Sequence, residues 1–250
     1  MVIEFLEILG THSSDNLKTI CLNLCHVDGM KLFPGPIHAF DTVLTKFKNL
    51  NRLEIGYINQ QLIENLAESL SANFKQFCIT VHDGIEARIS DWAWMALKTS
   101  CPDLGVTLNV TDNLLHVLLS PKIPLVNIAV QHIGSFSHQF GIKNIAKLFK
   151  HSLEELHIRV YDVEPDQYDK FFTHLASFQR LTTFSMSMHI KTEQNIKFLR
   201  AFGDMLKRPN TLRDVTFKYH DSRTIGSKVR TEIDKLKEEF GLLLKFEILD

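Results

Sequence analysis

Leu153-Glu-Glu-Leu156-His-Ile158-Arg-Val160 is the stretch that decides the fold of this 250-residue chain. An apolar residue, two variable residues and a second apolar residue are followed by alternating polar and apolar positions. Alternation with a period of two is the pattern of a strand that buries one face. The pattern recurs along the chain, and self-similarity at a period of about 20–50 residues indicates a repeat architecture.

Eight further copies of the pattern are present. They begin at Leu17, Leu50, Phe74, Leu104, Leu125, Leu181, Leu212 and Leu243, and the copy at Leu104 is degenerate. With Leu153 included, the successive steps are 33, 24, 30, 21, 28, 28, 31 and 31 residues. Steps of this length suit one strand and one helix per unit. We interpret residues 3–8 as one further, truncated copy.

The segments between the copies have the three- and four-residue spacing of helices. This spacing predicts helices within 60–73, before His151, after Pro165, before Pro209, and over the stretch that ends at Gly241. Nine such units predict an α/β fold with parallel strands. An open solenoid would place the strands on its concave face and the helices on its convex face. A closed eightfold α/β barrel, typically about 250 residues long, or an open α/β sheet is the alternative.

The regular template favours the open solenoid, because no polar or glycine-rich loop recurs after the strands as the active-site face of a barrel would require. We therefore predict one elongated domain over 1–250 with about nine irregular repeats. Architectures of this kind usually bind other proteins, so we predict a protein-interaction scaffold rather than an enzyme. An enzyme on the eightfold barrel is kept as the less favoured alternative.

The overall composition limits the classes of partner and the cellular location that we expect. Lys and Arg total 28 and Asp and Glu total 29, and the stretch 227–238 is mixed in charge, so no basic face for nucleic acid is expected. No apolar run is long enough for a membrane span, and the amino terminus is a poor signal peptide. The 4 cysteines are too few and scattered for a disulfide framework. We predict reduced cysteines and a cytoplasmic or nuclear location.

The 12 histidines do not form a recognisable ligand pattern. His132 and His138 are six residues apart, which fits no short metal-ligand pair. His82, His189 and His220 share the ninth position of their copies. They could form a metal-binding or pH-sensing row, but we interpret them as bonding the backbone of the turns.

Other catalytic signatures are incomplete. The segment 134–138 lacks the second glycine of a nucleophile elbow. Asp162, Glu164 and Asp166 lack the glycine and the distal glutamate of a calcium loop. We predict no catalytic, metal-binding or cofactor-binding residue. Trp92 and Trp94 stand two apart on an expected helix, where they cannot share a face, so one should be core and the other a surface or interhelical contact.

The template resembles the leucine-rich repeat, L-x-x-L-x-L-x-x-N/C. Leu17 to Cys25 fits it through the terminal cysteine, whereas the later copies lose the Asn or Cys, which implies an irregular solenoid. The segment Asp91-Trp92-Ala-Trp94-Met-Ala-Leu97-Lys-Thr-Ser-Cys101-Pro102-Asp-Leu104 is similar to the helix-to-strand join of F-box/leucine-rich-repeat proteins.

The F-box resemblance implies a substrate-recognition module for a cullin-based ubiquitin ligase, with a protein substrate on the concave face. The F-box, a helical motif opening on a Leu-Pro pair, is not found, so the chain is expected to lack it or an amino-terminal cap. A Skp-type adaptor is then a partner only if an F-box exists upstream. A leucine-rich-repeat regulator or inhibitor unconnected to ubiquitin is the alternative with the same fold.

Alternation also predicts which side chains carry function. Template residues face the core, and their polar neighbours should line the concave face. The predicted interaction residues are Arg52, Glu54, Gln76, Asn109, Asn127, Gln131, Glu155, His157, Arg159, Ser187, Lys218 and His220. Such a surface is suited to specific polar recognition of a protein segment and does not have the character of an apolar pocket.

Overall fold

A computed structural model gives the fold of the chain. It describes residues 16–22, 46–56, 58–70, 72–81, 88–111, 115–133, 140–160, 167–188, 192–220, 227–241 and 244–249, with Ile8, Thr11 and Leu44. The chain divides into two compact units, Met1–Leu125 and Val126–Asp250. The single-domain assignment for 1–250 stays a prediction.

Each of the nine sequence copies lies on a strand. The strands are β1 (Thr19–Leu22), β2 (Arg52–Ile55), β3 (Gln76–Val81), β4 (Gly105–Thr111), β5 (Leu125–Ile133), β6 (Glu155–Val160), β7 (Thr183–Met188), β8 (Asp214–His220) and β9 (Leu244–Leu249). They are parallel and follow the chain in the order β1-β2-β3-β4-β5-β6-β7-β8-β9. The predicted α/β class with parallel strands is therefore confirmed, including the degenerate copy at Leu104.

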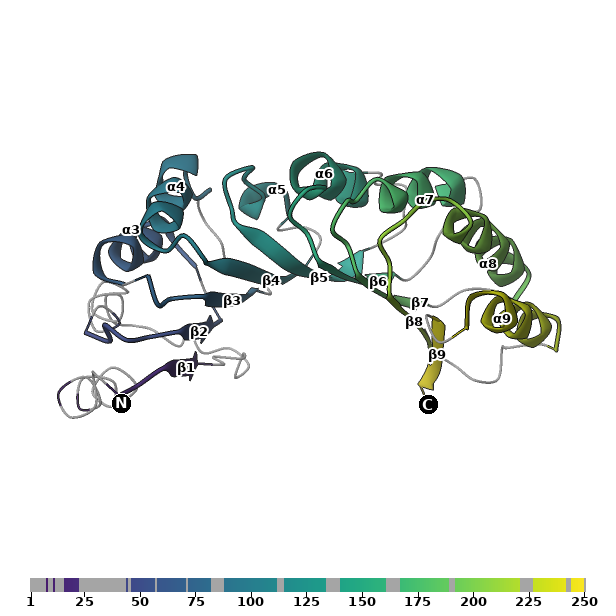
Figure 1. Ribbon diagram of the computed structural model, residues 1–250, viewed down its shortest axis with the longest axis horizontal. Coiled ribbons are helices and arrows are strands. Elements are labelled where there is room, and N and C mark those ends of the chain that lie inside the picture. The colour runs from purple at the N-terminus through teal and green to yellow at the C-terminus, as the bar shows by residue number, and fades with distance from the viewer. Residues whose placement is uncertain are drawn as a thin grey trace. The chain divides into compact units, whose positions relative to one another are not determined.

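From β2 onward, helices connect successive strands and lie on one face of them within each unit (Figure 1). They are α3 (Gln60–Ser69), α4 (Asp91–Ser100), α5 (Leu115–Leu118), α6 (Phe140–Phe149), α7 (Tyr168–Ala176), α8 (Thr192–Leu206) and α9 (Ser227–Phe240). All of the helices expected from spacing are present. The sequence did not predict α5, which occupies the shortest step between copies, where only a single turn fits.

Local signals fix where several helices begin and end. The Asn59 side chain accepts a hydrogen bond from the Leu62 amide at 2.6 Å, and Ser90 caps α4 by accepting from the Ala93 amide at 3.2 Å. These polar caps satisfy amides that the first helical turn leaves unpaired. Gly241 follows α9 with a φ of 65°, a left-handed conformation that glycine adopts without strain.

The core lies between the strands and the helices of each unit. Burial alternates along β3, β4 and β7, as the period-two pattern predicted. Leu156 and Ile158 of β6 are buried, whereas Glu155 and His157 beside them are partly exposed. The alternation of inward and outward residues is thus confirmed, and it leaves the face of the strands opposite the helices to polar side chains.

Backbone amides at the starts of β7 and β8 donate hydrogen bonds to carbonyl groups of the preceding repeat. The amides of Thr182 and Thr183 donate to the Glu154 carbonyl at 2.9 and 3.1 Å, and those of Arg213 and Asp214 donate to the Thr182 carbonyl at 2.8 and 3.0 Å. This backbone ladder gives each of these amides a hydrogen-bond partner.

Several predictions fall wholly or mainly on residues outside the described ranges. The side chains of His82, His189 and His220 lie outside the described residues, so their proposed role in turn bonding stays a prediction. The side chains of His132 and His138 also lie outside the described residues, as do Asp162, Glu164 and Asp166. The interpretations given for these residues therefore stay predictions. Of the opening segment 3–8, only Ile8 is described; it is helical and exposed, which does not fit a buried strand position.

Candidate functional site

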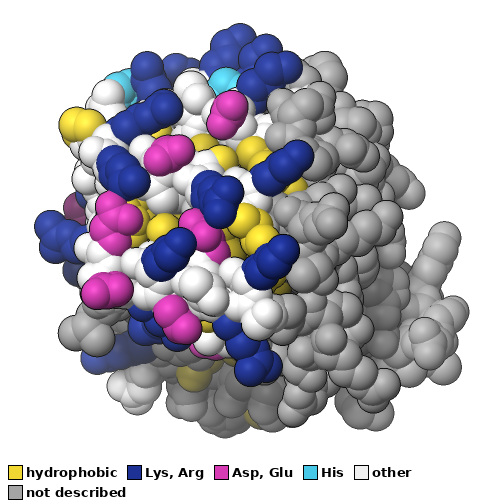
Figure 2. All heavy atoms as spheres, turned by 90° about the vertical axis from the view of Figure 1, so that its right-hand side faces the viewer, with side chains coloured by type: hydrophobic (Ala, Val, Ile, Leu, Met, Phe, Trp, Pro, Cys, Tyr) yellow, Lys and Arg dark blue, Asp and Glu magenta, His cyan; other side chains and the backbone are white. Residues whose placement is uncertain are grey.

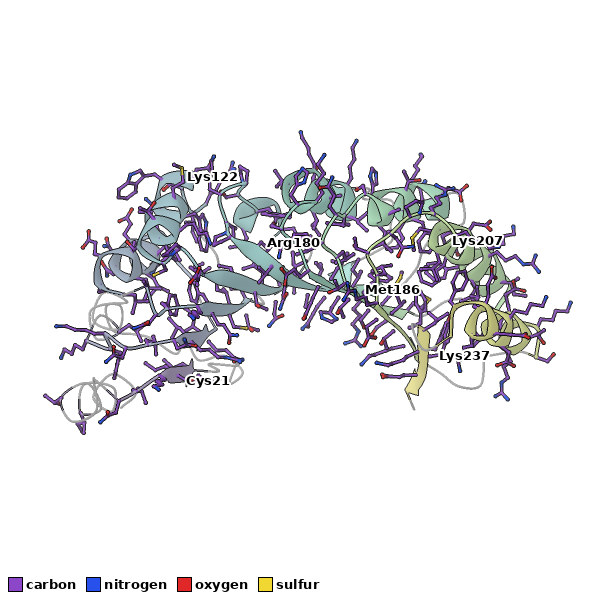
Figure 3. The ribbon with its side chains drawn as sticks, in the orientation of Figure 1. Cys21, Lys122, Arg180, Met186, Lys207 and Lys237 are labelled. Carbon is purple, nitrogen blue, oxygen red and sulfur yellow. The ribbon has the colours of Figure 1, made fainter. Side chains whose placement is uncertain are left out.

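The candidate site is the open face, defined as the side of the strands away from the helices in each unit. Figure 3 shows side chains extending from the strands on this side. Arg52 and Gln76 are exposed, and the other predicted interaction residues whose side chains are described are half-buried. His220 belongs to β8, but its side chain lies outside the described residues.

Parallel register arranges these residues in rows across neighbouring strands. In the first unit, Arg52 is level with Gln76, and Cys21, Glu54 and Cys78 form the adjoining row. In the second unit, Asn127 is level with Glu155, and Arg159, Ser187 and Lys218 form a row over three strands. The register of this last row comes from the β6–β7 and β7–β8 pairings. The predicted residues are therefore brought together as two sets, one in each unit.

Polar contacts organise the open face of the first unit. Arg52 Nη2 donates to Glu54 Oε2 at 3.1 Å along the same strand. Asn109 Nδ2 donates to Thr80 Oγ1 at 3.1 Å and approaches Cys78 Sγ at 3.7 Å. The side-chain amide of Asn109 is thus held by its neighbours on β3.

The described cysteines of this unit have raised thiol pKa values. Burial raises the pKa of Cys78, and the Glu54 carboxylate raises it further. For Cys21, labelled in Figure 3, burial is again the largest cause, followed by the charge and hydrogen bond of Glu54, while Arg52 lowers the pKa. Cys21 and Cys78 are free thiols. Thiols of this kind are poor nucleophiles at neutral pH, because the thiolate is the reactive form.

The opposing effects of Glu54 and Arg52 give a test at Cys21. We expect Glu54→Gln to speed the alkylation of Cys21 by iodoacetamide at pH 8, because the lost negative charge lowers the thiol pKa. Arg52→Gln should slow the alkylation. Mass spectrometry of the peptide that contains Cys21 measures both rates. A change in the same direction for the two variants would contradict this electrostatic account.

Charged residues on the open face of the second unit are arranged mainly as pairs. Lys218 Nζ lies 3.1 Å from Glu247 Oε2, and Lys245 Nζ lies 2.8 Å from Asp214 Oδ2. Sequence reasoning missed Asp214, Lys245 and Glu247 as members of this face. The alternation in the copies at Leu212 and Leu243 could have found them.

His157 and Arg159 complete the face on β6. His157 Nε2 lies 3.7 Å from Glu155 Oε2, a contact that is an ion pair only when the imidazole is protonated. Arg159 has no ion pair among the described residues, and its Nε is buried without a hydrogen-bond partner there. The face therefore has one strong cationic donor that the described part of the chain does not satisfy.

A surface cavity lies at the amino-terminal edge of β6, β7 and β8, away from the predicted residues. Its lining residues are Glu154, Gln179, Arg180, Thr182, Asn210, Thr211, Leu212 and Arg213. Most of the polar groups already have internal partners: Arg180, labelled in Figure 3, pairs with Glu154, and Thr211 donates to the Leu181 carbonyl at 2.6 Å. Most polar groups of the cavity are therefore engaged in holding the turns that precede the strands.

The helix-bearing side of the second unit has mixed charge. Figure 2, which views the side of α8 and α9, shows Lys and Arg interspersed with Asp and Glu. Arg200 of α8 lies 3.4 Å from Glu232 of α9, and Lys207, directly after α8, lies 3.6 Å from Glu239 of α9. The expectation that 227–238 is mixed rather than basic fits this arrangement.

The two tryptophans of α4 have opposite environments, as predicted. Trp94 is fully buried, whereas Trp92 is 64% exposed. Met95, three residues after Trp92 and therefore on the same helix face, is 50% exposed. At the end of α4, the Cys101 amide donates to Leu97 at 2.9 Å, and the Leu104 amide donates to Cys101 at 3.1 Å. These bonds close the helix-to-strand join.

Within the described ranges, no group of three or more His, Cys, Asp and Glu side chains is placed to hold a metal ion. None of the helices in that part of the chain has the length and apolar character needed to cross a membrane. No protein-family model matches the chain, and comparison with the curated proteins gives no match.

Proposed function

We propose that this protein is a binding scaffold that holds a protein partner on the open face of an irregular leucine-rich-repeat solenoid. The observation that carries the proposal is the open face itself. Strand after strand presents polar, partly exposed side chains there, while the helices cover the opposite face in each unit. The nine copies of the template, each on a strand, and the sequential strand order support this architecture.

Side-chain exposure argues against a closed α/β barrel, and strand order argues against a doubly wound α/β sheet. In a closed eight-stranded barrel the side chains opposite the helices fill a packed interior. Here the side chains of Glu155 and His157 are 43% and 42% exposed. A doubly wound sheet has helices on both faces and a reversal of strand order, whereas these strands follow the chain.

The surface suits protein recognition more than the binding of a small molecule or nucleic acid. Small-molecule sites are concave and mostly apolar with few polar groups, whereas this face is polar along each strand. Nucleic acid requires an excess of positive charge, but Glu155, Asp214 and Glu247 lie among the cations of this face. A protein segment that offers hydrogen bonds and both signs of charge fits it best.

The narrower proposal is a substrate receptor of the F-box/leucine-rich-repeat type for a cullin-based ubiquitin ligase. Its support is the resemblance of the segment 91–104, which forms α4 and a closed turn into β4. In such receptors the adaptor binds the F-box, so the whole gene product is the material to test. Recovery of a Skp-type adaptor with it would favour this proposal, and a partner recovered without adaptor would favour a regulator or inhibitor outside ubiquitin pathways.

Site-specific photo-crosslinking tests the binding face. A photoreactive benzoylphenylalanine replaces Ser185, in the middle of the open face on β7, and in a matched variant replaces Lys170, exposed on α7. In cells that express the protein, we expect a crosslinked protein adduct from position 185 and none from position 170. Adducts from position 170 alone, or none from position 185, would count against the open face as the binding surface.

A further inference from the structure

Arg159 is the exception in the charge pattern of the second unit's open face. Lys218 and Lys245 each contact a carboxylate on the neighbouring strand, and His157 has Glu155 beside it. Arg159 contacts no acid among the described residues, and its Nε is removed from water without an acceptor. A buried donor left unpaired is costly, and more so when it is charged. The guanidinium as a whole is only partly buried, and none of its N–H groups has an acceptor among the described residues, so an acid from outside can pair with its Nη groups.

Ser187 stands next to Arg159. The two residues are directly level in the β6–β7 pairing, and Lys218 is level with Ser187 on the next strand. Adjacent strands lie about 4.8 Å apart, so the arginine fork and the serine hydroxyl can reach one anionic group. The Ser187 hydroxyl has no hydrogen bond within the described part of the chain. This row therefore offers several donors at one place on the face.

The donor groups of Arg159, Ser187 and Lys218 determine which kind of ligand this row can bind. A guanidinium presents paired N–H groups that match a carboxylate in a bidentate arrangement. At a partly exposed position, a single such pair contributes little by itself, so a free small anion would bind weakly. A carboxylate attached to a peptide would gain further contacts from Ser185 and Thr216, which lie on the neighbouring row of the same strands.

We propose that Arg159 and Ser187 form an anchor for an Asp or Glu side chain of an acidic segment in the protein partner. The proposal rests on the proposed function, because it names the chemistry that the open face recognises. Arg159 supplies the charge and the fork, and Ser187 supplies one more donor. Lys218, already held by Glu247, adds positive potential beside them.

Selection from a phage library of random 12-residue peptides tests the anchor on the full chain. Peptides selected on the wild-type protein should be enriched in Asp and Glu relative to the starting library, and Arg159→Gln should abolish the enrichment. The matched control is Arg213→Gln, an exposed arginine at the edge of the sheet and off the open face, which should preserve it. Thermal melting by circular dichroism verifies that each variant folds.

Affinity then measures the anchor directly. For the selected acidic peptides, Arg159→Gln should weaken binding by up to about fivefold. Arg159→Lys keeps the charge but loses the fork, so it should give an intermediate loss. Replacement of the acidic residue by its amide in the peptide should weaken binding to the wild type and leave binding to Arg159→Gln almost unchanged.

The outcomes separate this inference from the proposed function. Peptides without acidic enrichment, enrichment that survives Arg159→Gln, or no selected peptide would each overturn the carboxylate anchor. If open-face crosslinks still form from position 185 in any of these cases, protein binding by the open face stands and only its preference for acidic segments is lost. Loss of those crosslinks as well would remove both proposals.

Discussion

Replacement of Phe217 by alanine is expected to lower the free energy of unfolding by about 3–5 kcal/mol. Phe217 is fully buried on β8. Its ring lies 4.8 Å from that of Phe202 and 5.6 Å from that of Phe198, both edge-on from α8, and 5.5 Å from Phe246 of β9. Phe184 of β7 completes the cluster at 6.1 Å. Alanine would lose these contacts and leave a cavity that the surrounding elements cannot readily fill.

Urea unfolding followed by circular dichroism measures this loss. Thr216→Ala is the matched control, because Thr216 is on the same strand but faces outward, and it should change stability by no more than about 0.5 kcal/mol. Phe217→Leu retains most of the apolar volume and should give a smaller loss than alanine. A loss for Phe217→Ala no greater than that of the Thr216 control would refute the helix-facing assignment of the template positions.

The strands were predictable because burial of one face determines their sequence pattern. Burial of one face requires alternation, so residues such as Leu156 and Ile158 reveal both the strand and its inward side. Most helices were predictable for the same reason, from apolar residues at intervals of three and four. The short helix Leu115–Leu118 was not, because one turn is too short to show a helical period.

The contacts of the candidate site could be predicted only in part. Alternation places Arg159 and Glu155 on the same face, but it does not reveal which acid contacts which base. That depends on register and on rotamers: Lys218 meets Glu247 because β8 and β9 align these positions directly. The cavity beside Arg180 also escaped prediction, because its residues come from three turns that share no motif and meet only after the strands align.

Trp94→Ala should destabilise the first unit by about 3–5 kcal/mol, whereas Trp92→Ala should change its stability by no more than about 0.5 kcal/mol. Both residues lie on α4, yet Trp94 is fully buried beside Ala93 and Leu97, and Trp92 is 64% exposed. Truncation of Trp94 removes a large apolar surface from the core. Truncation of Trp92 removes mainly surface that was already in water.

Fluorescence makes the same distinction without relying on stability. In Trp92→Phe the remaining Trp94 should emit at short wavelength and resist acrylamide quenching, and in Trp94→Phe the remaining Trp92 should emit at longer wavelength and be quenched readily. Trp94→Phe also tests the indole N–H, which has no acceptor among the described residues. Because phenylalanine removes this unsatisfied donor while keeping a ring in the core, its loss of stability should be well below that of alanine. Equal losses for phenylalanine and alanine would mean that the indole N–H makes a bond in solution, and equal quenching of the two tryptophans would overturn the orientation of α4.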